Sequence, residues 1–323
     1  MSISVLRTAD AWYVEVPGTG KAVEVTTKAT TTADLLADRA AVDKAAATAS
    51  EATEATEATG AVDVASLDTV SPVTTPCRVV AQMVNFRSHA KDSGFDPDTV
   101  LPTFFRKASG SVSGPGVTIV RPAHVRLLDY EVELGLVLGA PLPVGTTVTE
   151  RDLPRYVAGL VVTNDVSARD IQLPKGQFYE SKSYPTFTPV GPRLVLLETG
   201  DVARLERLRL RLWVNDVLRQ DRTLADMIVR PAEALTLLAR FQALDAGDLL
   251  LTGTPGGTAL KAPAKIAEII GGLLPPAVKW KAFFSRAESN PDYLQHGDVV
   301  TATIATDDGA LDLGTQRTPV EHS

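Results

Sequence analysis

The sequence predicts an α+β fold that is rich in β-strands, with a small domain in front of it. From about Pro76 onward, short apolar segments alternate with Gly and Pro, which is typical of strands joined by turns. Helical segments are few there and do not alternate regularly with strands, which argues against a doubly wound sheet. The residues before Pro76 contain an Ala-rich stretch instead. We therefore divide the chain into an N-terminal domain, 1–75, and a main domain, 76–323.

The N-terminal domain is predicted to contain two short strands, Ile3–Val5 and Trp12–Val16, and one helix. Ala33–Thr59 is Ala-rich with few turn residues, which favours a helix. Its last part, 51–59, repeats Glu-Ala-Thr and places like charges on one face, where they repel. We expect this end to be solvated and to fray, with an acidic docking face as the alternative. No residue of this domain suggests catalytic chemistry.

The main domain is predicted to contain many strands and two helices. The predicted strands are Arg78–Val84, Val117–Val120, Glu131–Leu138, Gly159–Thr163, Arg193–Leu197, Arg207–Val214, Asp248–Thr252 and Val299–Ile304. The predicted helices are Pro231–Leu244 and one within Lys265–Ser285.

Composition excludes several classes of protein. The formal net charge of −7 argues against a nucleic-acid partner, because binding phosphates requires a basic surface. The single cysteine, Cys77, excludes an intrachain disulfide and is expected to be a buried small residue. No basic segment followed by an apolar one begins the chain, and no apolar run is long enough for a membrane span. We expect a cytoplasmic enzyme with no membrane contact.

Two carboxylates share one face of a predicted strand. Residues two apart in a strand point the same way, so Glu131 and Glu133 face one side while Val132 faces the other. Adjacent carboxylates repel, and one is expected to hold a proton unless a cation lies between them. Charged strand faces are also common at solvent-exposed edges, so this segment alone leaves both interpretations open.

Polar residues follow the next predicted strand directly. Gly159–Thr163 leads into Asn164 and Asp165, and such positions after a buried strand often carry functional sites. If the chain turns helical there, Arg169 lies one turn beyond Asp165, and Gln172 follows on nearly the same side. A surface Asp–Arg pair is the alternative interpretation.

Two further segments combine polar groups with unusual backbone. Ser181–Pro192 is too rich in proline for regular structure, yet it carries Lys182 and several hydroxyl groups. Asp248–Thr252 is an apolar strand that ends in Gly253-Thr254-Pro255-Gly256-Gly257, where the glycines let backbone amides approach an anion.

These four segments, in this order, resemble the fumarylacetoacetate hydrolase family. The matching motifs are Asp-Tyr-Glu-x-Glu-Leu at 129–134, Asn-Asp-x-Ser-Ala-Arg-Asp-x-Gln at 164–172, Lys-Ser-x-x-Thr-Phe-x-Pro-x-Gly-Pro at 182–192 and Thr-Gly-Thr-Pro-x-Gly at 252–257. The resemblance covers approximately residues 80–323. It implies a mixed β-sheet roll and a homodimer.

The resemblance also implies roles for individual residues. Glu131, Glu133 and Asp165 match the family's metal carboxylates, and an all-oxygen anionic set suits Mg²⁺ or Mn²⁺, with Ca²⁺ as a further candidate. The positions that match substrate-contacting residues or residues near the developing charge are Arg169, Gln172, Lys182 and Thr254, and Thr186 matches the outer environment of the metal.

The candidate catalytic base departs from the family pattern. Where the family often has Asn-Tyr-x-x-His-x-x-Glu, this chain has Asn85, Phe86, His89 and Asp92. His89 and Asp92 are three apart, so on a helical turn the carboxylate can orient the imidazole. The replacements by Phe86 and Asp92 put the reach of this pair and the polarity of its pocket in question.

The resemblance implies a metal-dependent hydrolase that cleaves a carbon–carbon bond in a diketo acid, an acylpyruvate or fumarylpyruvate-like substrate. Lys182 and Arg169 would support the charge of the enolate fragment, and His89 with Asp92 would activate water. The alternative is a decarboxylase or isomerase of a small oxo-dicarboxylic acid, which we expect to tolerate loss of His89. A non-catalytic metal scaffold is the remote alternative. We expect the substrate to be selected by Gly94–Ser113 and by Ala259–Leu294, which is longer than the usual family connection.

Overall fold

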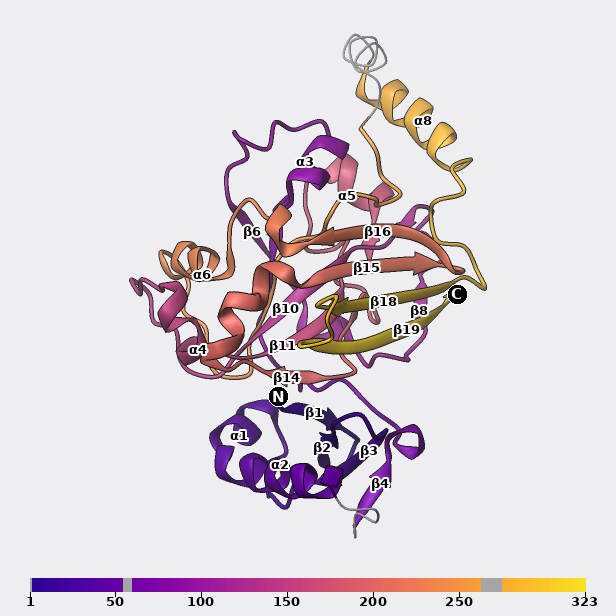
Figure 1. The fold of residues 1–323 in the computed structure, drawn as a ribbon. Helices are drawn as coiled ribbons and strands as arrows, with labels where there is room; N and C mark the ends of the chain where they lie inside the picture. Colours follow the sequence, from indigo (N-terminus) through magenta and orange to yellow (C-terminus); the bar gives the residue numbers. More distant parts are fainter. Residues whose placement is uncertain (1, 55–59, 263–274) are drawn as a thin grey trace.

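Two β-sheets form the framework of the computed structural model, which describes residues 2–54, 60–262 and 275–323 (Figure 1). The larger sheet has ten strands in the order β4-β3-β2-β1-β14-β11-β10-β17-β5-β6, and the smaller has five in the order β16-β15-β18-β19-β8. Most neighbours are antiparallel, whereas β17 with β5 and β19 with β8 are parallel. The predicted β-rich α+β fold with a mixed sheet is therefore confirmed.

The strands have the following bounds. The ten-stranded sheet contains β1 (Ser4–Arg7), β2 (Trp12–Val16), β3 (Lys21–Glu24), β4 (Ala61–Asp63), β5 (Val79–Met83), β6 (Thr103–Lys107), β10 (Val132–Leu138), β11 (Val157–Asn164), β14 (Leu194–Leu196) and β17 (Leu249–Leu251). The five-stranded sheet contains β8 (Ile119–Arg121), β15 (Arg209–Val214), β16 (Val217–Thr223), β18 (Val299–Ala305) and β19 (Asp312–His322). Two short pairs join β9 (Leu128–Asp129) to β12 (Ser167–Ala168), and β7 (Val112–Ser113) to β13 (Thr188–Pro189).

The described α-helices are short apart from α2 and α8. They are α1 (Thr32–Ala37), α2 (Arg39–Glu54), α3 (Arg87–Asp92), α4 (Leu153–Tyr156), α5 (Arg169–Lys175), α6 (Pro231–Ala239) and α8 (Pro276–Ala287). The 3₁₀ helices are η1 (Val64–Ser66), η2 (Ser109–Ser111), η3 (Glu150–Asp152), η4 (Thr199–Arg207) and η5 (Leu224–Asp226). Among the described residues, no helix has the length and apolar character needed to cross a bilayer.

The N-terminal strands continue the large sheet. β1 pairs with β14, so β1 to β4 extend the sheet away from the rest of the chain, and α2 covers β2 and β3 (Figure 1). Trp12, Val14 and Val16 alternate into the core under α2, as a period of two requires. The boundary at residue 75 stays a prediction.

The single helix predicted for Ala33–Thr59 is two helices in the structure. α1 begins at a capping box, in which Thr31 Oγ1 accepts from Asp34 N and Asp34 Oδ2 accepts from Thr31 N. Asp38 interrupts the helical backbone between α1 and α2. Residues 55–59, with the end of the Glu-Ala-Thr repeat, and residues 263–274 lie outside the described parts.

Strand β10 occupies the centre of the large sheet. All 7 of its residues are buried, and it pairs with β11 on one side and β17 on the other. Gly135 makes this packing possible, since a Cβ there would lie 2.6 Å from Val161 Cγ2 and 2.8 Å from Thr163 Cγ2. The acidic residues of β10 are therefore carried by the most enclosed strand rather than by a solvent-exposed edge.

Sequence patterns missed several strands. The composition of β16 and β19 is too polar for an apolar-segment search, because one face of each is exposed. β19 also contains Pro319 and Gly314, which normally argue against a strand. β6 was also missed. It is an edge strand of the large sheet, pairs antiparallel with β5 and ends at Lys107.

Candidate active site

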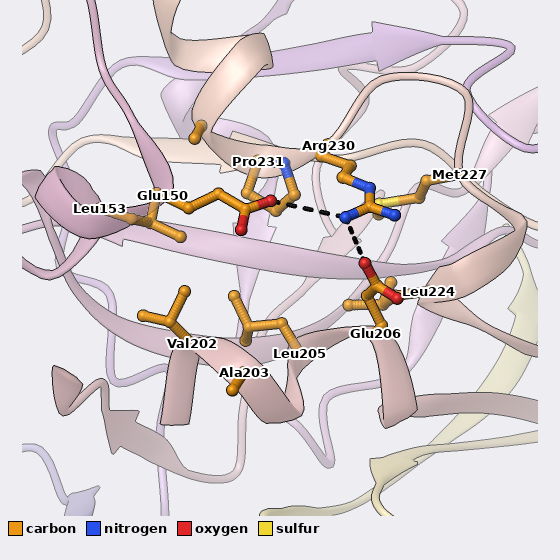
Figure 2. A pocket seen from close by; sticks show the side chains of 11 residues that line it. Glu150, Leu153, Val202, Ala203, Leu205, Glu206, Leu224, Met227, Arg230 and Pro231 are labelled. Carbon is orange, nitrogen blue, oxygen red and sulfur yellow. Dashed lines mark ion pairs between the residues drawn. The ribbon is translucent and has the colours of Figure 1, made fainter. Parts of the chain in front are cut away.

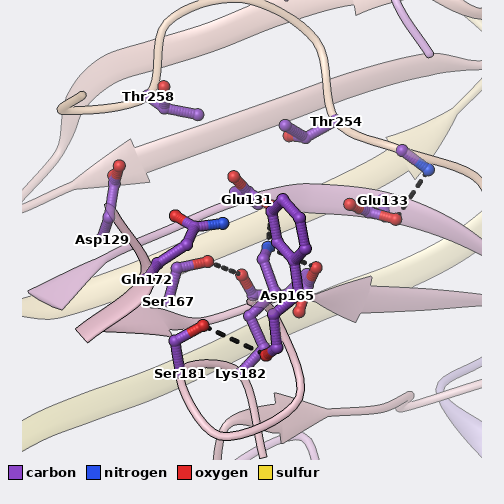
Figure 3. Close-up of polar contacts among 12 residues, drawn as sticks. Asp129, Glu131, Glu133, Asp165, Ser167, Gln172, Ser181, Lys182, Thr254 and Thr258 are labelled. Carbon is purple, nitrogen blue, oxygen red and sulfur yellow. Dashed lines mark hydrogen bonds and ion pairs between the residues drawn. The ribbon is translucent and has the colours of Figure 1, made fainter. Parts of the chain in front are cut away.

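Three buried carboxylates converge where β10 and β11 lie side by side. Glu131 immediately precedes β10, Glu133 lies within it, and Asp165 follows β11, where Asp165 N donates to Glu131 O at 2.8 Å. One oxygen from each side chain lies within 4.8 Å of the others (Figure 3). We call Glu131, Glu133 and Asp165 the carboxylate triad. The structure thus brings together the three acids that the strand pattern singled out.

Local pairing explains this convergence. Glu133 lies opposite Thr163 in the antiparallel register, and Asn164 Oδ1 accepts from Glu131 N at 2.9 Å. The alternation of β10 then turns Glu131 and Glu133 to the same side as Asp165. Glu131 and Glu133 at the start of β10 and Asp165 just after the paired strand β11 therefore form the cluster.

Three basic side chains surround the carboxylate triad. Lys182 Nζ donates to Glu131 Oε2 at 2.6 Å and to Asp165 Oδ2 at 2.5 Å. Arg169 Nη2 donates to Glu131 Oε1, and Lys107 Nζ donates to Asp165 Oδ1. All three side chains are at least 96% buried, and the side chain of Asp165 is 99% buried.

Burial and charge act in opposite directions on the acids of the carboxylate triad. Burial raises the pKa of Glu133 well above its ordinary value, and the neighbouring charges of Asp165 and Glu131 raise it further. Burial also acts to raise the pKa of Glu131, but the charges of Lys182 and Arg169 prevail and lower it. A proton on Glu133 is the outcome expected for adjacent carboxylates without a dication, and an ion bound there would displace that proton.

The donor set fits a hard dication. Every candidate ligand atom is a carboxylate oxygen, which Mg²⁺, Mn²⁺ and Ca²⁺ prefer and thiolate-seeking ions do not. The ammonium group of Lys182 lies between Glu131 Oε2 and Asp165 Oδ2, so the position between these oxygens already accommodates a positive charge. The residues therefore suit a metal ion of this class.

Arg169 is held in place by a buried network that the sequence patterns did not reveal. It begins α5, and the helical turn predicted between Asp165 and Arg169 is not present, because β12 lies between these two residues. The Nη1 of Arg169 donates to Gln172 Oε1 at 2.8 Å. Its Nε donates at 2.8 Å to Asp129 Oδ2, and Asp129 also accepts from the backbone N–H groups of Tyr130, Ala259 and Leu260. Asp129 thus connects Arg169 to the start of the 259–294 segment.

Lys107 is the second residue that sequence analysis missed. It is the last residue of β6, and it also donates to Phe187 O at 2.9 Å. The adjacent Phe104 and Phe105 are the signal that could have predicted a strand here. A lysine inside such a strand requires a buried acidic partner, but the sequence does not say which one.

Thr254 lies in the loop after β17 and is buried. Its hydroxyl donates to Val132 O at 3.0 Å and accepts from Gln220 Nε2 at 2.9 Å, so this loop is fastened to β10. Gly253 and Gly257 are needed here, with φ of +87° and +109° and no room for a Cβ. Gly253 N donates to Glu133 Oε2 at 2.7 Å, so the loop offers a backbone amide to the carboxylate triad.

The predicted helical turn around His89 is present as α3, but the predicted contact with Asp92 is not seen. Asp92 Oδ2 accepts from Gly257 N at 3.0 Å and from Lys261 Nζ at 3.1 Å. Its carboxylate therefore binds the end of Gly253–Gly257, which we call the glycine-rich loop. His89 Nδ1 is buried without a hydrogen-bond partner among the described residues. Burial lowers the pKa of His89, the charge of Glu131 acts to raise it, and the charges of Arg169 and Lys182 act to lower it further.

The role of Thr186 in the outer environment of the metal stays a prediction. Its backbone has φ of +71°, and its hydroxyl accepts from Val120 N at 2.9 Å. The contact that this segment makes with the cations of the site comes from the next residue, through Phe187 O and Lys107. Phe86, in place of the family's tyrosine, is fully buried in the core.

A separate pocket lies over η4 and η5 and carries different chemistry. In Figure 2 the guanidinium of Arg230 lies between Glu206 and Glu150, with the Glu150 oxygen at 3.5 Å, above apolar side chains such as Leu205 and Met227. These charged side chains are 50–63% exposed, so their ion pairs contribute little energy. The buried groups suited to catalysis lie instead around the carboxylate triad.

Comparisons with known proteins agree with this arrangement. The model for the C-terminal domain of fumarylacetoacetate hydrolase matches residues 78–321. The mitochondrial oxaloacetate tautomerase Fahd2a of Rattus norvegicus is 33% identical over 192 residues, which are 59% of this chain and 59% of that protein. Oxaloacetate tautomerase YisK of Bacillus subtilis is 35% identical over 58% of this chain and 62% of its own length. The alignments therefore span less than two thirds of these relatives.

A solved structure extends the similarity to the whole chain. It is named a probable 2-hydroxyhepta-2,4-diene-1,7-dioate isomerase from Mycobacterium abscessus, and it has a TM-score of 0.72 and 27% identity. The comparison covers 100% of this chain and 99% of that one. With the matching family model and the four ordered motifs, these similarities establish that the chain belongs to the fumarylacetoacetate hydrolase family of enzymes.

Proposed function

We propose that this protein is a divalent-metal-dependent tautomerase or isomerase of a small oxo-dicarboxylic acid, with keto–enol interconversion of an oxaloacetate-like acid as the first candidate. This replaces carbon–carbon bond hydrolysis as the preferred activity. The reason is that the similar proteins are named oxaloacetate tautomerases and the similar structure is named a dioate isomerase. The alternative considered from sequence is therefore favoured over the main expectation.

The convergence of the carboxylate triad is the observation that carries the proposal. Glu131, Glu133 and Asp165 offer oxygens within 4.8 Å of one another in a buried site, which suits Mg²⁺ or Mn²⁺. Such an ion supplies positive charge that stabilises an enolate oxygen. Both tautomerisation and isomerisation of an oxo-acid pass through a species with this charge.

Lys182 and Arg169 provide positive charge beside the reacting group. Burial acts to lower the pKa of Lys182, but the charges of Asp165 and Glu131 prevail and raise it, so the ammonium stays protonated. Arg169 is oriented by Asp129 and Gln172. In a buried site such oriented cations bind a substrate carboxylate and stabilise negative charge that develops during the reaction.

His89 is the proposed proton acceptor. Burial lowers the pKa of His89, so its imidazole is neutral at neutral pH and can take a proton from carbon. We infer that a tautomerase also depends on His89, contrary to the sequence-based expectation, because enolisation moves a proton as hydrolysis does. The bonding of Asp92 to Gly257 and Lys261 leaves His89 without the partner proposed for activating water, which supports tautomerisation over hydrolysis.

Gln172 and Thr254 are proposed to act in substrate binding. Gln172 is buried beside Arg169, and its side-chain oxygen fixes the guanidinium. The Thr254 hydroxyl donates its hydrogen bond to Val132 O and accepts one from Gln220 Nε2. To donate to a substrate carboxylate, it would have to break the hydrogen bond to Val132 O. The loop amides and glycines around Thr254 provide further donors for an anion.

A substrate panel tests the activity. Chelator-treated protein is supplied with Mg²⁺ or Mn²⁺ and mixed with oxaloacetate, an unsaturated oxo-dioate and an acylpyruvate. Enol loss is followed by ultraviolet absorbance. Pyruvate formed from oxaloacetate reports decarboxylation, whereas pyruvate formed together with a second carboxylic acid from the acylpyruvate reports hydrolysis. We expect metal-dependent tautomerisation or isomerisation to be the fastest. Faster acylpyruvate cleavage would restore the hydrolase assignment, and silence across the panel would favour a non-catalytic scaffold.

We further propose a homodimer, as the family resemblance implies. Light scattering coupled to gel filtration tests it, with a mass near twice the 34.3 kDa chain as the expected result. A mass of one chain at assay concentration would contradict it.

A further inference from the structure

The two oxygens of Asp165 are held by two different lysines. Lys107 Nζ donates to Oδ1, and Lys182 Nζ donates to Oδ2 at 2.5 Å. Both lysine side chains are buried, with 0% and 3% of their surface exposed. A metal ion that uses Asp165 as a ligand therefore competes with one of these lysines for its oxygen.

The second contact of each lysine indicates which one gives way. Lys182 also donates to Glu131 Oε2 at 2.6 Å, so both of its short contacts are to oxygens of the carboxylate triad, where an ion would bind. Lys107 instead donates to Phe187 O at 2.9 Å, a backbone carbonyl outside the carboxylate triad. An incoming ion competes directly with Lys182, whereas Lys107 keeps an anchor that the ion does not touch.

Each carboxylate of the triad has one oxygen that accepts a hydrogen bond from a group other than Lys182. Arg169 holds Glu131 Oε1, Gly253 N holds Glu133 Oε2 at 2.7 Å, and Lys107 holds Asp165 Oδ1. The protein thereby occupies one oxygen of every candidate ligand. Once an ion takes the place of Lys182, each carboxylate is left with one oxygen for that ion.

We propose that Lys107 is a positioning residue that selects the metal: it keeps Asp165 a one-oxygen ligand and so favours Mg²⁺ or Mn²⁺ over Ca²⁺. This inference rests on the metal site of the proposed function. Mg²⁺ takes six ligands in near-ideal octahedral geometry, which suits carboxylates that each give one oxygen. Ca²⁺ takes six to eight oxygens and gains from carboxylates that give both. Lys107 denies Ca²⁺ the second oxygen of Asp165.

Lys107 is the most suitable of the three holding groups to test. Arg169 is assigned to the substrate, and Gly253 acts through its backbone. The variant Lys107→Met keeps the length of the side chain and removes the donor. Lys107→Gln keeps a shorter donor and serves as a second variant in case Lys107→Met does not fold. Lys91→Met removes an exposed lysine from α3 as a matched control.

The experiment is titration calorimetry of chelator-treated full-length protein with Mg²⁺ and, separately, Ca²⁺. The readout is the ratio of the two dissociation constants, because removal of a charge acts alike on both dications and cancels in the ratio. We expect the preference for Mg²⁺ over Ca²⁺ to fall roughly 10-fold or more in Lys107→Met. It should fall less in Lys107→Gln and stay unchanged in Lys91→Met.

Two results would overturn the inference, and they are distinguishable. Equal changes in both dissociation constants would show that Lys107 contributes charge alone and does not select the ion. Failure of the unsubstituted protein to bind either ion would remove the proposed metal site itself. Circular dichroism of each variant separates these results from loss of folding.

Discussion

The carboxylate triad and a charged patch on the small sheet use the same residue types in opposite surroundings. The patch consists of Arg209, Arg211, Asp221 and Asp307, where Arg209 Nη2 donates to Asp221 Oδ2 at 2.8 Å. Its side chains are 22–60% exposed, whereas the side chain of Asp165 is 1% exposed. Alternating charges on adjacent strands therefore do not define a functional site. What distinguishes the carboxylate triad is its enclosure by β10, β11 and β17.

The ion pairs of the patch and those of the carboxylate triad also differ in how much free energy they contribute. Exposed ion pairs contribute up to about 1 kcal/mol and are screened by salt. A buried charge that loses its partner costs about 3–5 kcal/mol. Breaking an ion pair of the carboxylate triad is thus costly, whereas breaking one in the patch changes the free energy of unfolding little.

The largest effect is expected from Asp165→Asn. It removes one of three anionic ligands, and metal affinity should fall by roughly 10³-fold, equivalent to several kcal/mol. Calorimetric Mg²⁺ titration measures this, with Asp307→Asn in the exposed patch as the matched control that keeps full affinity. Equal Mg²⁺ affinity of the two variants would contradict the distinction between the carboxylate triad and the exposed patch.

The next largest effect is expected from His89→Asn. Removing the proposed proton acceptor should lower kcat by about 10²-fold or more. Because burial lowers the pKa of His89, the acid limb of kcat/KM in the unsubstituted enzyme should lie below the ordinary histidine value of 6.5. Steady-state rates between pH 4.5 and 8 measure both. A His89→Asn variant with undiminished kcat would remove the imidazole from the mechanism.

A third, smaller effect concerns stability. Asp129→Asn removes the charge that faces Arg169 in a fully buried position, and we expect about 3 kcal/mol less free energy of unfolding. Denaturant unfolding of the metal-free protein measures this. A loss below about 1 kcal/mol would place Asp129 with the exposed pairs rather than with the buried ones.

The smallest effect is expected from Asp221→Asn in the exposed patch. The hydrogen bond from Arg209 lowers the pKa of Asp221 below its ordinary 3.8, so this carboxylate stabilises the fold above pH 3.8. That contribution is lost as the pH falls through the lowered pKa, and it amounts to at most about 1 kcal/mol at low salt. Unfolding at pH 7 in low and high salt should differ little between variant and parent. A large loss of unfolding free energy that does not depend on salt would contradict the contrast between the exposed patch and the buried carboxylate triad.

Local alternation accounts for what could be predicted. Glu131 and Glu133 lie two apart at the start of β10, Asp165 directly follows β11, and Arg169 begins the helix that carries Gln172. Each of these relations is set by a few consecutive residues. The β-rich fold followed from the same short-range patterns.

The residues that were missed depend on long-range pairing. Lys107 reaches Asp165 because β6 lies beside β5 in the large sheet, and Asp129 reaches Arg169 through the short pairing of β9 with β12. Asp92 illustrates the opposite error, since its spacing from His89 predicted a contact that the glycine-rich loop takes instead. No local pattern contains this information, because the competing partner lies 165 residues away.

The most direct test follows metal binding and turnover in one titration. Chelator-treated protein is titrated with Mg²⁺ or Mn²⁺ while bound ion and tautomerisation of oxaloacetate are measured at each point. We predict that activity rises in proportion to occupancy and saturates at one ion per chain. Full turnover in the metal-free protein, or saturation of binding without any gain in rate, would contradict the assignment of the carboxylate triad.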